Sequence, residues 1–400
     1  MSLAFREARE ANLDRLVEIH QSAFPDARGV EARARNFAHN PLGPLRDLVV
    51  AESRAGIVAH GFLFALEAWF GGRRVKVGGV SSLGVAPEAR GLGIGRALLG
   101  ELHARARERQ QAITLLYPFR QAFYRPDGYA AVSPYRSLEL CPDAIPGAWR
   151  DRRGGVLRAA TGGDRDALVR VHEREGARQT GLVARPPALW EMQLLDERRR
   201  WFVVERDERV TGYLAWTLTQ PGPQAPITLR IDDVGACDDA DRRLLLALAG
   251  EQRDQIDAIE LEVADDDPLP RALVDPDRNR PGSVRAAHPL GAVLSGPIVR
   301  VIDPSRAIEA RGYSCEGGLD LELPDDTVHV EVSAGRALVL PSRGGGRLRL
   351  DLSVLGAVLY GALTPSAGSR LGWITADSPA TLALADALFA LPAFFTRDTF

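Results

Sequence analysis

The chain has 400 residues, of which 45% are hydrophobic and 26% are charged, as in an ordinary folded protein. A single hydrophobic core rarely serves more than about 300 residues, so the length predicts two or three domains. The 50 basic and 53 acidic side chains give a net charge of −3, which disfavours nucleic acid as a partner.

The cysteines and the hydropathy pattern set further limits. Cys141, Cys237 and Cys315 are far apart and odd in number, which argues against a disulfide framework and against a metal site of closely spaced cysteines. No stretch approaches the roughly twenty consecutive apolar residues of a membrane helix, and the N-terminus lacks the apolar core of a signal peptide. We therefore expect a cytoplasmic protein with no metal site and no membrane partner.

The first part of the chain predicts a helix and a β-hairpin. Apolar residues with helical spacing predict a helix over residues 13–24. Proline and glycine interrupt residues 24–45, where we expect an irregular, mobile loop that faces a substrate. Two strand-like runs, residues 48–52 and 57–70, are joined by a short turn and predict the hairpin.

A strand, a glycine-rich turn, a helix and a second strand follow. Residues 74–85 form the first predicted strand, and the turn Arg-Gly-Leu-Gly-Ile-Gly occupies residues 90–95. Leucines with helical spacing predict the helix, and the apolar run at residues 112–118 predicts a buried strand parallel to the first. In such units ligands bind at the carboxyl ends of the strands.

The glycine turn is a candidate anion site. The unpaired N–H groups of a first helical turn and the positive end of the helix dipole both favour phosphate. The alternative is a glycine-rich loop without a ligand. Tyr124 lies on the segment that leaves the second strand, at the same end of the unit. It is either a functional phenol or a core aromatic whose hydroxyl finds a hydrogen bond.

Behind a linker rich in proline and glycine, residues 142–155, the pattern recurs. Residues 201–219 repeat the hairpin, and residues 230–264 repeat the strand, turn, helix and strand. In place of the glycine turn the second copy has Asp-Ala-Asp at residues 239–241, whose carboxylates would repel phosphate. We interpret this part as a degenerate copy that has kept the fold and lost the cofactor site. The alternative is a chance similarity of two α/β domains.

The last part of the chain has a different pattern. Chain-breaking residues at 265–289 predict another boundary or a long exposed loop. Strand-like runs then alternate with helical pieces, of which residues 352–363 and 381–391 are the clearest, and this order predicts an α+β domain. The aromatic end of the chain, residues 392–400, is too apolar to be left in solvent, so we expect it to dock on the protein.

The segment around the glycine turn resembles a known motif. Residues 80–99 resemble the acetyl-CoA motif of the GNAT superfamily of N-acetyltransferases, whose Arg-x-x-Gly-x-Gly core corresponds to Arg90, Gly93 and Gly95. The order of features along the whole chain is similar to that of the Eis (enhanced intracellular survival) family, whose members acetylate aminoglycosides and lysines at several positions.

The resemblance implies α/β and α+β domains in a fixed order. These are two tandem GNAT-like domains, the second one degenerate, and then a domain similar to sterol carrier proteins. We expect the active, acetyl-CoA-binding GNAT domain at residues 1–150, the degenerate one at 151–286 and the sterol-carrier-like one at 287–400, with the C-terminal tail in the active site. Family members are often hexamers, so the resemblance also implies a homo-oligomer.

The resemblance implies roles for single residues as well. Tyr124 matches the family's general acid, and the terminal carboxylate of Phe400 matches its general base. The residues expected to hold acetyl-CoA are Leu83, Gly84, Val85, Arg90, Gly91, Gly93, Ile94, Gly95 and Arg96. The chain departs from the usual family residues at Phe119, Arg120, Pro126 and Asp127, so we expect a different fine shape of the acetyl and acceptor pocket.

The predicted activity is transfer of acetyl from acetyl-CoA, without a metal, to a primary amine that attacks the thioester directly. The acceptor is expected to be cationic, either an aminoglycoside-like molecule or a lysine. Acidic or aromatic groups suited to a cation are Phe24, Asp26, Trp69 and Asp398, and each of them has an alternative role as an ordinary surface or core residue. The alternative function is a non-catalytic sensor that binds an acyl-CoA or a lipid.

Overall fold

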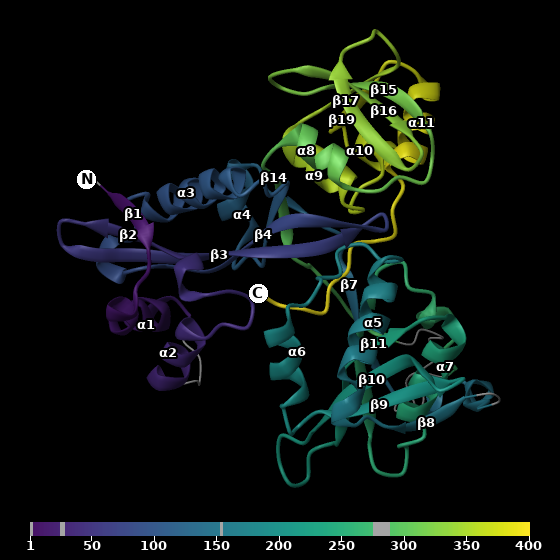
Figure 1. The fold of residues 1–400 in the computed structure, drawn as a ribbon. Helices are drawn as coiled ribbons and strands as arrows, with labels where there is room; N and C mark the ends of the chain where they lie inside the picture. The colour runs from purple at the N-terminus through teal and green to yellow at the C-terminus, as the bar shows by residue number, and fades with distance from the viewer. Residues whose placement is uncertain (1–2, 25–28, 153–154, 275–288) are drawn as a thin grey trace.

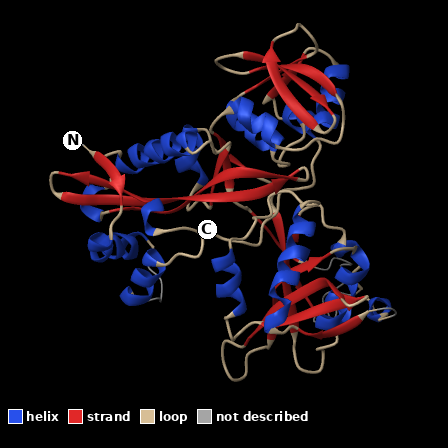
Figure 2. Ribbon diagram, in the orientation of Figure 1, coloured by secondary structure: helices blue, strands red, loops and turns tan. Residues whose placement is uncertain are grey.

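The computed structural model describes residues 3–24, 29–152, 155–274 and 289–400. Each of three β-sheets carries helices of its own, and the three bodies are separate in outline (Figure 1). Helices and strands are mixed within each body, as the predicted α/β and α+β classes require (Figure 2).

The first sheet contains the predicted hairpin and the strand, turn, helix and strand unit. Its strands, in spatial order, are β1 (Ala4–Glu7), β2 (Leu48–Ser53), β3 (Gly56–Phe70), β4 (Arg73–Val85), β5 (Ile113–Leu116), β14 (Ile298–Val301) and β6 (Ala130–Ala131). β4 and β5 are parallel, as predicted, and they are joined through α3 (Ile94–Glu108). α3 covers one face of the sheet, where Leu98, Leu99 and Leu102 are buried, and α1 (Leu13–Ala23) covers the other face (Figure 1).

The predicted irregular segment after α1 contains a helix. α2 (Val30–Ala38) lies within residues 24–45 and buries Phe37 against the first domain. The prediction of an irregular loop was therefore wrong for this part. α2 is short and lies between proline- and glycine-containing segments, so the chain-breaking residues on both sides outweighed its own pattern.

The second sheet repeats the first, as predicted. Its strands, in spatial order, are β13 (Gly291–Leu294), β7 (Tyr135–Leu140), β12 (Ala258–Ala264), β11 (Thr228–Ala236), β10 (Arg209–Thr219), β9 (Arg200–Arg206) and β8 (Val156–Ala159). β11 and β12 are parallel, and α7 (Asp239–Gly250) connects them. Two further helices, α5 (Arg165–Gly176) and α6 (Pro187–Leu194), complete this domain.

Strands are exchanged between these two sheets. β7 precedes the predicted linker, yet it pairs with β12 in the second sheet. β14 follows the second domain, yet it returns to the first sheet and pairs with both β5 and β6. Sheet membership therefore differs from the ranges 1–150, 151–286 and 287–400. The strand sequences carry no mark of this exchange, because either sheet offers a partner for a short apolar strand.

The third domain has the predicted α+β pattern. Its sheet consists of β17 (Arg336–Pro341), β16 (Thr327–Ser333), β15 (Gly317–Glu322), β18 (Arg347–Leu350) and β19 (Ile374–Ala376). Its helices are α8 (Pro304–Ala310), α9 (Leu352–Leu359), α10 (Pro365–Arg370) and α11 (Pro379–Phe389). After α11 the chain runs back as an extended tail between the first two domains, drawn in yellow in Figure 1.

No helix in the described part of the chain is both long and apolar enough to cross a membrane. The same residues contain no group of three or more His, Cys, Asp and Glu side chains that could hold a metal ion.

The exchanged strand β14 should contribute to the stability of the whole first sheet. Val299 on β14 is fully buried, so Val299→Ala should lower the free energy of unfolding by about 2 kcal/mol. Val293 on β13 is 65% exposed and gives the matched control, because Val293→Ala should change stability by no more than about 0.5 kcal/mol. Urea denaturation followed by circular dichroism measures both, and equal effects would contradict the assigned role of β14.

Candidate active site

The glycine turn leads directly into α3. Gly91 and Gly93 have φ angles of +79° and +76°, a left-handed conformation that favours glycine, and Gly93 is the N-cap of α3. An added Cβ would meet no atom within 4 Å at either glycine, so the backbone angle and not crowding requires the residue type. The first N–H groups of α3 have no acceptor inside the helix. The turn therefore offers donors and open space to an anion.

The two arginines of the motif are used within the protein. Arg90 donates from Nε to the carbonyl of Val85 (3.1 Å) and from Nη2 to the carbonyl of Ser22 (2.9 Å). It therefore holds the turn against the end of β4 and the end of α1. Nε of Arg96 lies 3.3 Å from Oδ1 of Asp127. Arg90 therefore has a structural role in shaping the turn, and the expectation that Arg90 and Arg96 also contact acetyl-CoA stays a prediction.

β4 and β5 part beyond their short parallel pairing. That pairing ends at Gly79 and Leu115, while β4 continues to Val85 along β3. A bulge interrupts the β3–β4 register next to Ser82, whose φ is +51°, a strained value for a residue with a side chain. Strain of this kind is found at functional sites more often than elsewhere. The parting of the strands opens the sheet at its carboxyl end, where α/β proteins bind ligands.

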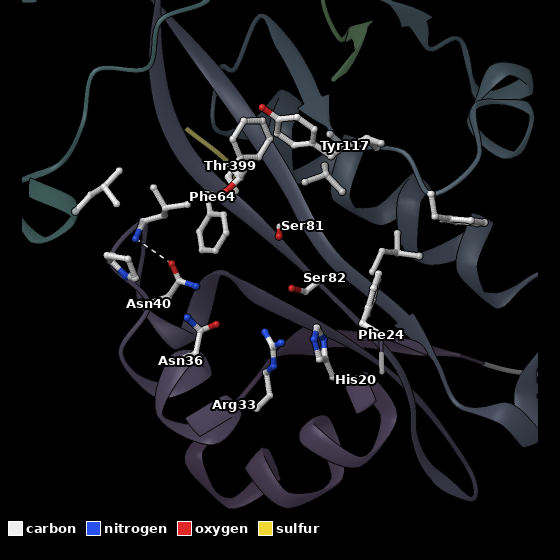
Figure 3. Close-up of a pocket in the computed structure, with 18 of the residues that line it drawn as sticks. His20, Phe24, Arg33, Asn36, Asn40, Phe64, Ser81, Ser82, Tyr117 and Thr399 are labelled. Atoms are coloured by element: carbon white, nitrogen blue, oxygen red, sulfur yellow. Dashed lines mark hydrogen bonds between the residues drawn. The ribbon is translucent and has the colours of Figure 1, made fainter. Parts of the chain in front are cut away.

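A pocket of about 490 Å³ lies in this opening. It is bordered by the end of β4, the segment after β5, the helices α1, α2 and α6, and the C-terminal tail. Its described lining residues are His20, Phe24, Arg33, Asn36, Asn40, Pro41, Leu42, Phe64, Val80, Ser81, Ser82, Leu83, Leu116, Tyr117, Phe119, Tyr124, Leu189, Met192, Thr399 and Phe400. In Figure 3 the hydroxyls of Ser81 and Ser82 face the side chains of Arg33 and Asn36 across this space.

Tyr124 is the last residue of the short helix α4 (Gln121–Tyr124), and it lines the pocket while only 4% of its surface is exposed. Burial raises the pKa of its phenol to about 12, so the group carries its proton throughout the neutral range. Tyr129 behaves differently: its hydroxyl is bound to Thr114 (2.9 Å) and His103 (3.0 Å), away from the pocket. The Tyr124 ring packs on Phe123 and Tyr129 in the core while the residue also lines the pocket, so its functional role stays a prediction.

The aromatic tail docks on the protein, as predicted. Phe394 and Phe395 are buried, and the Phe395 amide donates to the carbonyl of Thr180 (2.8 Å). Tyr117 donates from its hydroxyl to the carbonyl of Asp398 (3.2 Å), and the Phe400 ring lies 5.4 Å from the Tyr117 ring. The end of the tail thus reaches the pocket that Tyr124 lines.

The predicted acceptor-binding residues are scattered. Phe24 lines the pocket, whereas Asp26 lies outside the described residues. Trp69 is away from the pocket, packed against Gly176 of α5 and under the guanidinium of Arg74 (5.1 Å). Asp398 is buried and is bound by Nε of Arg185 at 2.8 and 2.9 Å. The structure corrects the prediction for Trp69 and Asp398, because their side chains meet partners from the second domain and do not face the pocket.

Several pocket residues had escaped sequence reasoning. His20 lies on the predicted helix α1 but was not among the predicted site residues, and Arg33 and Asn36 lie on the unpredicted helix α2. Ser81 and Ser82 offered the one usable signal, since two hydroxyl residues interrupt an apolar strand just before the glycine turn.

Comparison with known proteins agrees with this geometry. Two models of the acetyltransferase (GNAT) domain match the chain, one over residues 4–132 and another over residues 181–301. The N-acetyltransferases Eis of Mycobacterium tuberculosis and Mycobacterium bovis are 26% identical over 395 residues, which is 92% of this chain and of theirs. An uncharacterised N-acetyltransferase of Streptomyces griseus is 28% identical over 301 residues, covering 69% of this chain and 68% of its own.

Solved structures share the fold over the full length. A GCN5-related N-acetyltransferase from Anabaena variabilis superposes with a TM-score of 0.86 at 22% identity, and Eis1 from Mycobacterium abscessus with 0.79 at 23%, each covering 100% of both chains. Two successive domains of this kind define a GNAT acetyltransferase, a class of enzyme that uses acetyl-CoA. Together with the similarity to the mycobacterial enzymes, they show that the chain belongs to the Eis family of N-acetyltransferases.

The left-handed N-cap of α3 should be required for binding acetyl-CoA. Gly93→Ala places a side chain at φ +76°, and the strain of roughly 1–2 kcal/mol should weaken acetyl-CoA binding about tenfold. Gly100→Ala on the same helix is the control: nothing lies within 4 Å of its added Cβ, and it should stabilise the helix by about 0.5–1 kcal/mol without changing affinity. Isothermal titration calorimetry measures both, and equal affinities would remove the turn from the binding site.

Proposed function

We propose that this enzyme transfers the acetyl group of acetyl-CoA to a primary amine of a cationic acceptor, either an aminoglycoside-like molecule or a lysine side chain. The observation that supports this most directly is that one pocket is bordered by Tyr124, by the bulged end of β4 and by Phe400. The similarity to the mycobacterial N-acetyltransferases Eis supports an amine as the acceptor.

The residues present fit acetyl-CoA. The left-handed turn at Gly91 and Gly93 and the first turn of α3 offer N–H groups to the pyrophosphate. The edge of β4 beyond Gly79 no longer pairs with β5, so its backbone groups are available to the amides of the pantetheine arm. Acetyl-CoA supplies the thioester carbonyl and a thiol leaving group.

Tyr124 acts as the general acid. Its phenol gives a proton to the sulfur as the C–S bond breaks and recovers a proton from solvent afterwards. Because burial raises the pKa of the phenol to about 12, the donor is protonated at every pH at which the enzyme works. A sensor that only binds an acyl-CoA has no use for such a proton donor, so a buried phenol in the pocket favours an enzyme over a sensor.

The α-carboxylate of Phe400, in a chain that ends at this residue, acts as the general base. At neutral pH only about one in two thousand free lysine-type amines is unprotonated, so the acceptor must lose a proton before it attacks. The carboxylate takes that proton and passes it to solvent, the N–C bond forms and the C–S bond breaks. No covalent enzyme intermediate is needed.

The described lining of the pocket contains Arg33 and no Asp or Glu, so recognition of a cationic acceptor would rest on its aromatic faces and on the carboxylate of Phe400. Phe24, Phe64, Tyr117 and Phe119 contribute aromatic faces, which attract ammonium groups. The hydroxyls of Ser81 and Ser82 offer neutral hydrogen-bond acceptors beside them, and the volume of about 490 Å³ admits a molecule of several rings.

Removing the phenol of Tyr124 should slow the reaction without weakening the binding of acetyl-CoA. Tyr124→Phe is expected to lower kcat about 100-fold, the usual worth of a general acid, with the dissociation constant of acetyl-CoA unchanged. The profile of kcat against pH should keep its shape between pH 6 and 10, since a phenol of pKa about 12 does not titrate there. Release of free CoA thiol with a panel of polyamines and aminoglycosides measures the rate.

Tyr129→Phe is the matched control for that variant. It removes a hydroxyl that is buried and bound to Thr114 and His103, so it should cost about 1–3 kcal/mol of stability and leave kcat within twofold. An unchanged rate in Tyr124→Phe, or equal losses of rate in the two variants, would exclude Tyr124 as the proton donor.

Extending the chain beyond Phe400 moves the carboxylate away from the pocket. A 400-residue chain with two added C-terminal glycines should lose most of its kcat, while its affinity for acetyl-CoA stays within twofold. The same two glycines at the N-terminus serve as the control and should leave both quantities unchanged. Full activity in the C-terminally extended chain would exclude the carboxylate of Phe400 as the base.

A further inference from the structure

Two successive charged residues of the tail are bound by the second domain. Oδ1 and Oδ2 of Asp398 accept from Nε of Arg185 at 2.8 and 2.9 Å, and Nη1 of Arg185 donates to Asp233. The neighbouring Arg397 donates from Nη2 to Glu175 (3.0 Å), and its Nη1 lies 3.4 Å from Oδ1 of Asp233. We call these five residues the charge cluster.

The charge cluster is removed from solvent. The side chains of Arg185, Asp233 and Asp398 are 2%, 1% and 4% exposed, and those of Glu175 and Arg397 are 7% and 10% exposed. Burial alone would raise the pKa of Asp233, but Arg185 and Arg397 lower it to about 2, so it stays ionised. Buried ion pairs add little to stability compared with apolar packing, and their best-attested use is to fix one arrangement among several.

The alternation of charge fixes the register of the tail. In the observed register Asp398 faces Arg185, and Arg397 faces Glu175 and Asp233. A slip by one residue would bring Arg397 to Arg185 and so place two cations next to each other in a buried site. Like charges in such surroundings repel strongly, so the observed position of the tail is the one that pairs both Arg397 and Asp398 with opposite charges.

The charge cluster lies at the place in the second domain that matches the active site of the first. β11 and β12 pair up to Ile231 and Leu261 and then part, as β4 and β5 do. The register of β10 and β11 is interrupted next to Asp232, which repeats the bulge of β4 at Ser82. Asp233 follows directly after that bulge. The tail therefore occupies the opening that the first domain keeps for its substrates.

One residue of the tail borders both openings. A cavity of about 300 Å³ is lined by residues 231–234 of β11, residues 260–262 of β12, Arg397 and Thr399. Thr399 also lines the pocket that contains Tyr124. Beyond the charge cluster, Thr399 and Phe400 form no hydrogen bond or ion pair of their own with the described part of the chain. Their position is therefore set two residues earlier, together with the contact of Phe400 and Tyr117.

We propose that the second domain positions the tail for the reaction of the first. Its residues Arg185, Asp233 and Glu175 are positioning residues that hold Arg397 and Asp398. Phe400 is thereby placed in the active pocket of the first domain. This inference rests on the proposed function of Phe400. The second domain, which has lost its glycine turn, thus takes part in the reaction of the first by holding the chain that completes its pocket.

Removal of the central charge tests this inference. Arg185→Met keeps the length of the side chain and removes the cation, and it should lower kcat at least 30-fold with the dissociation constant of acetyl-CoA within twofold of wild type. Arg185→Lys, which retains the charge, should recover part of the loss. Arg158→Met is the matched control, because Arg158 pairs with Asp164 and Glu205 in the same domain without touching the tail, and it should leave kcat unchanged.

A second measurement follows the tail without relying on activity. Carboxypeptidase Y should release Phe400 from folded Arg185→Met at least 10-fold faster than from wild type or Arg158→Met, as measured by mass spectrometry. If Arg185→Met does not fold, Asp398→Asn gives the same test, since the amide keeps the shape of the carboxylate. Unchanged kcat together with an unchanged rate of Phe400 release would overturn the inference. A loss of kcat that is matched by a loss of acetyl-CoA affinity would also overturn it. So would a loss of kcat without faster release of Phe400.

The failure of the proposed function has a different signature. If wild type transfers acetyl to none of the amines tested, the proposed function fails. The release of Phe400 then still decides whether Arg185 holds the tail: resistance in wild type that is lost in Arg185→Met supports the anchoring, and resistance in both overturns it.

Discussion

The parting of β4 and β5 is the geometric constraint on which the active site depends. β5 ends at Leu116, whereas β4 continues to Val85, and an opening at the carboxyl end of the sheet is the result. The glycine turn and α3 follow β4, and Tyr124 follows β5, so both lie toward the same end of the sheet. Of the residues predicted for the site, Leu83 and Tyr124 line the pocket itself. The pocket still needs a wall on its open side, and α2, α6 and the tail provide it.

The second domain repeats this construction with its opening used differently. At the start of α7 the carboxylate of Asp238 accepts from the Asp241 amide (2.9 Å), and Asp241 is bound by Nε of Arg206 (2.7 Å). The helix terminus that corresponds to the proposed anion site of the first domain is thus satisfied by the protein's own acids. On β11, the strand that precedes α7, Asp233 contacts Arg185 and Arg397, and Arg397 belongs to the tail. The two openings of the same fold therefore carry different side chains, and this difference is the basis of the different roles that we propose for them.

Sequence reasoning succeeded where the cause of a structure is local. The hairpin, the glycine turn, α3 and the parallel pair β4–β5 follow from residues that are neighbours in the chain, and the docking of the tail follows from its own apolarity. It failed where distant segments decide. Asp398 has the right chemistry for a cationic substrate, yet Arg185, more than two hundred residues earlier, takes its carboxylate. The exchange of β7 and β14 and the burial of Phe37 on α2 likewise depend on which surfaces meet, and no spacing in the sequence encodes this.

The place of β14 has a consequence for the order in which the molecule is built. Leu116 at the end of β5 pairs with Ile298, so the sheet that carries the active site is incomplete until the ribosome has made the whole second domain. Until then the edge of β5 exposes unpaired backbone groups, which are a template for wrong pairing. Closing so long a loop slows folding much more than it weakens the final fold. The first domain is therefore the first to be synthesised, but its sheet cannot be completed until β14 has been synthesised as well.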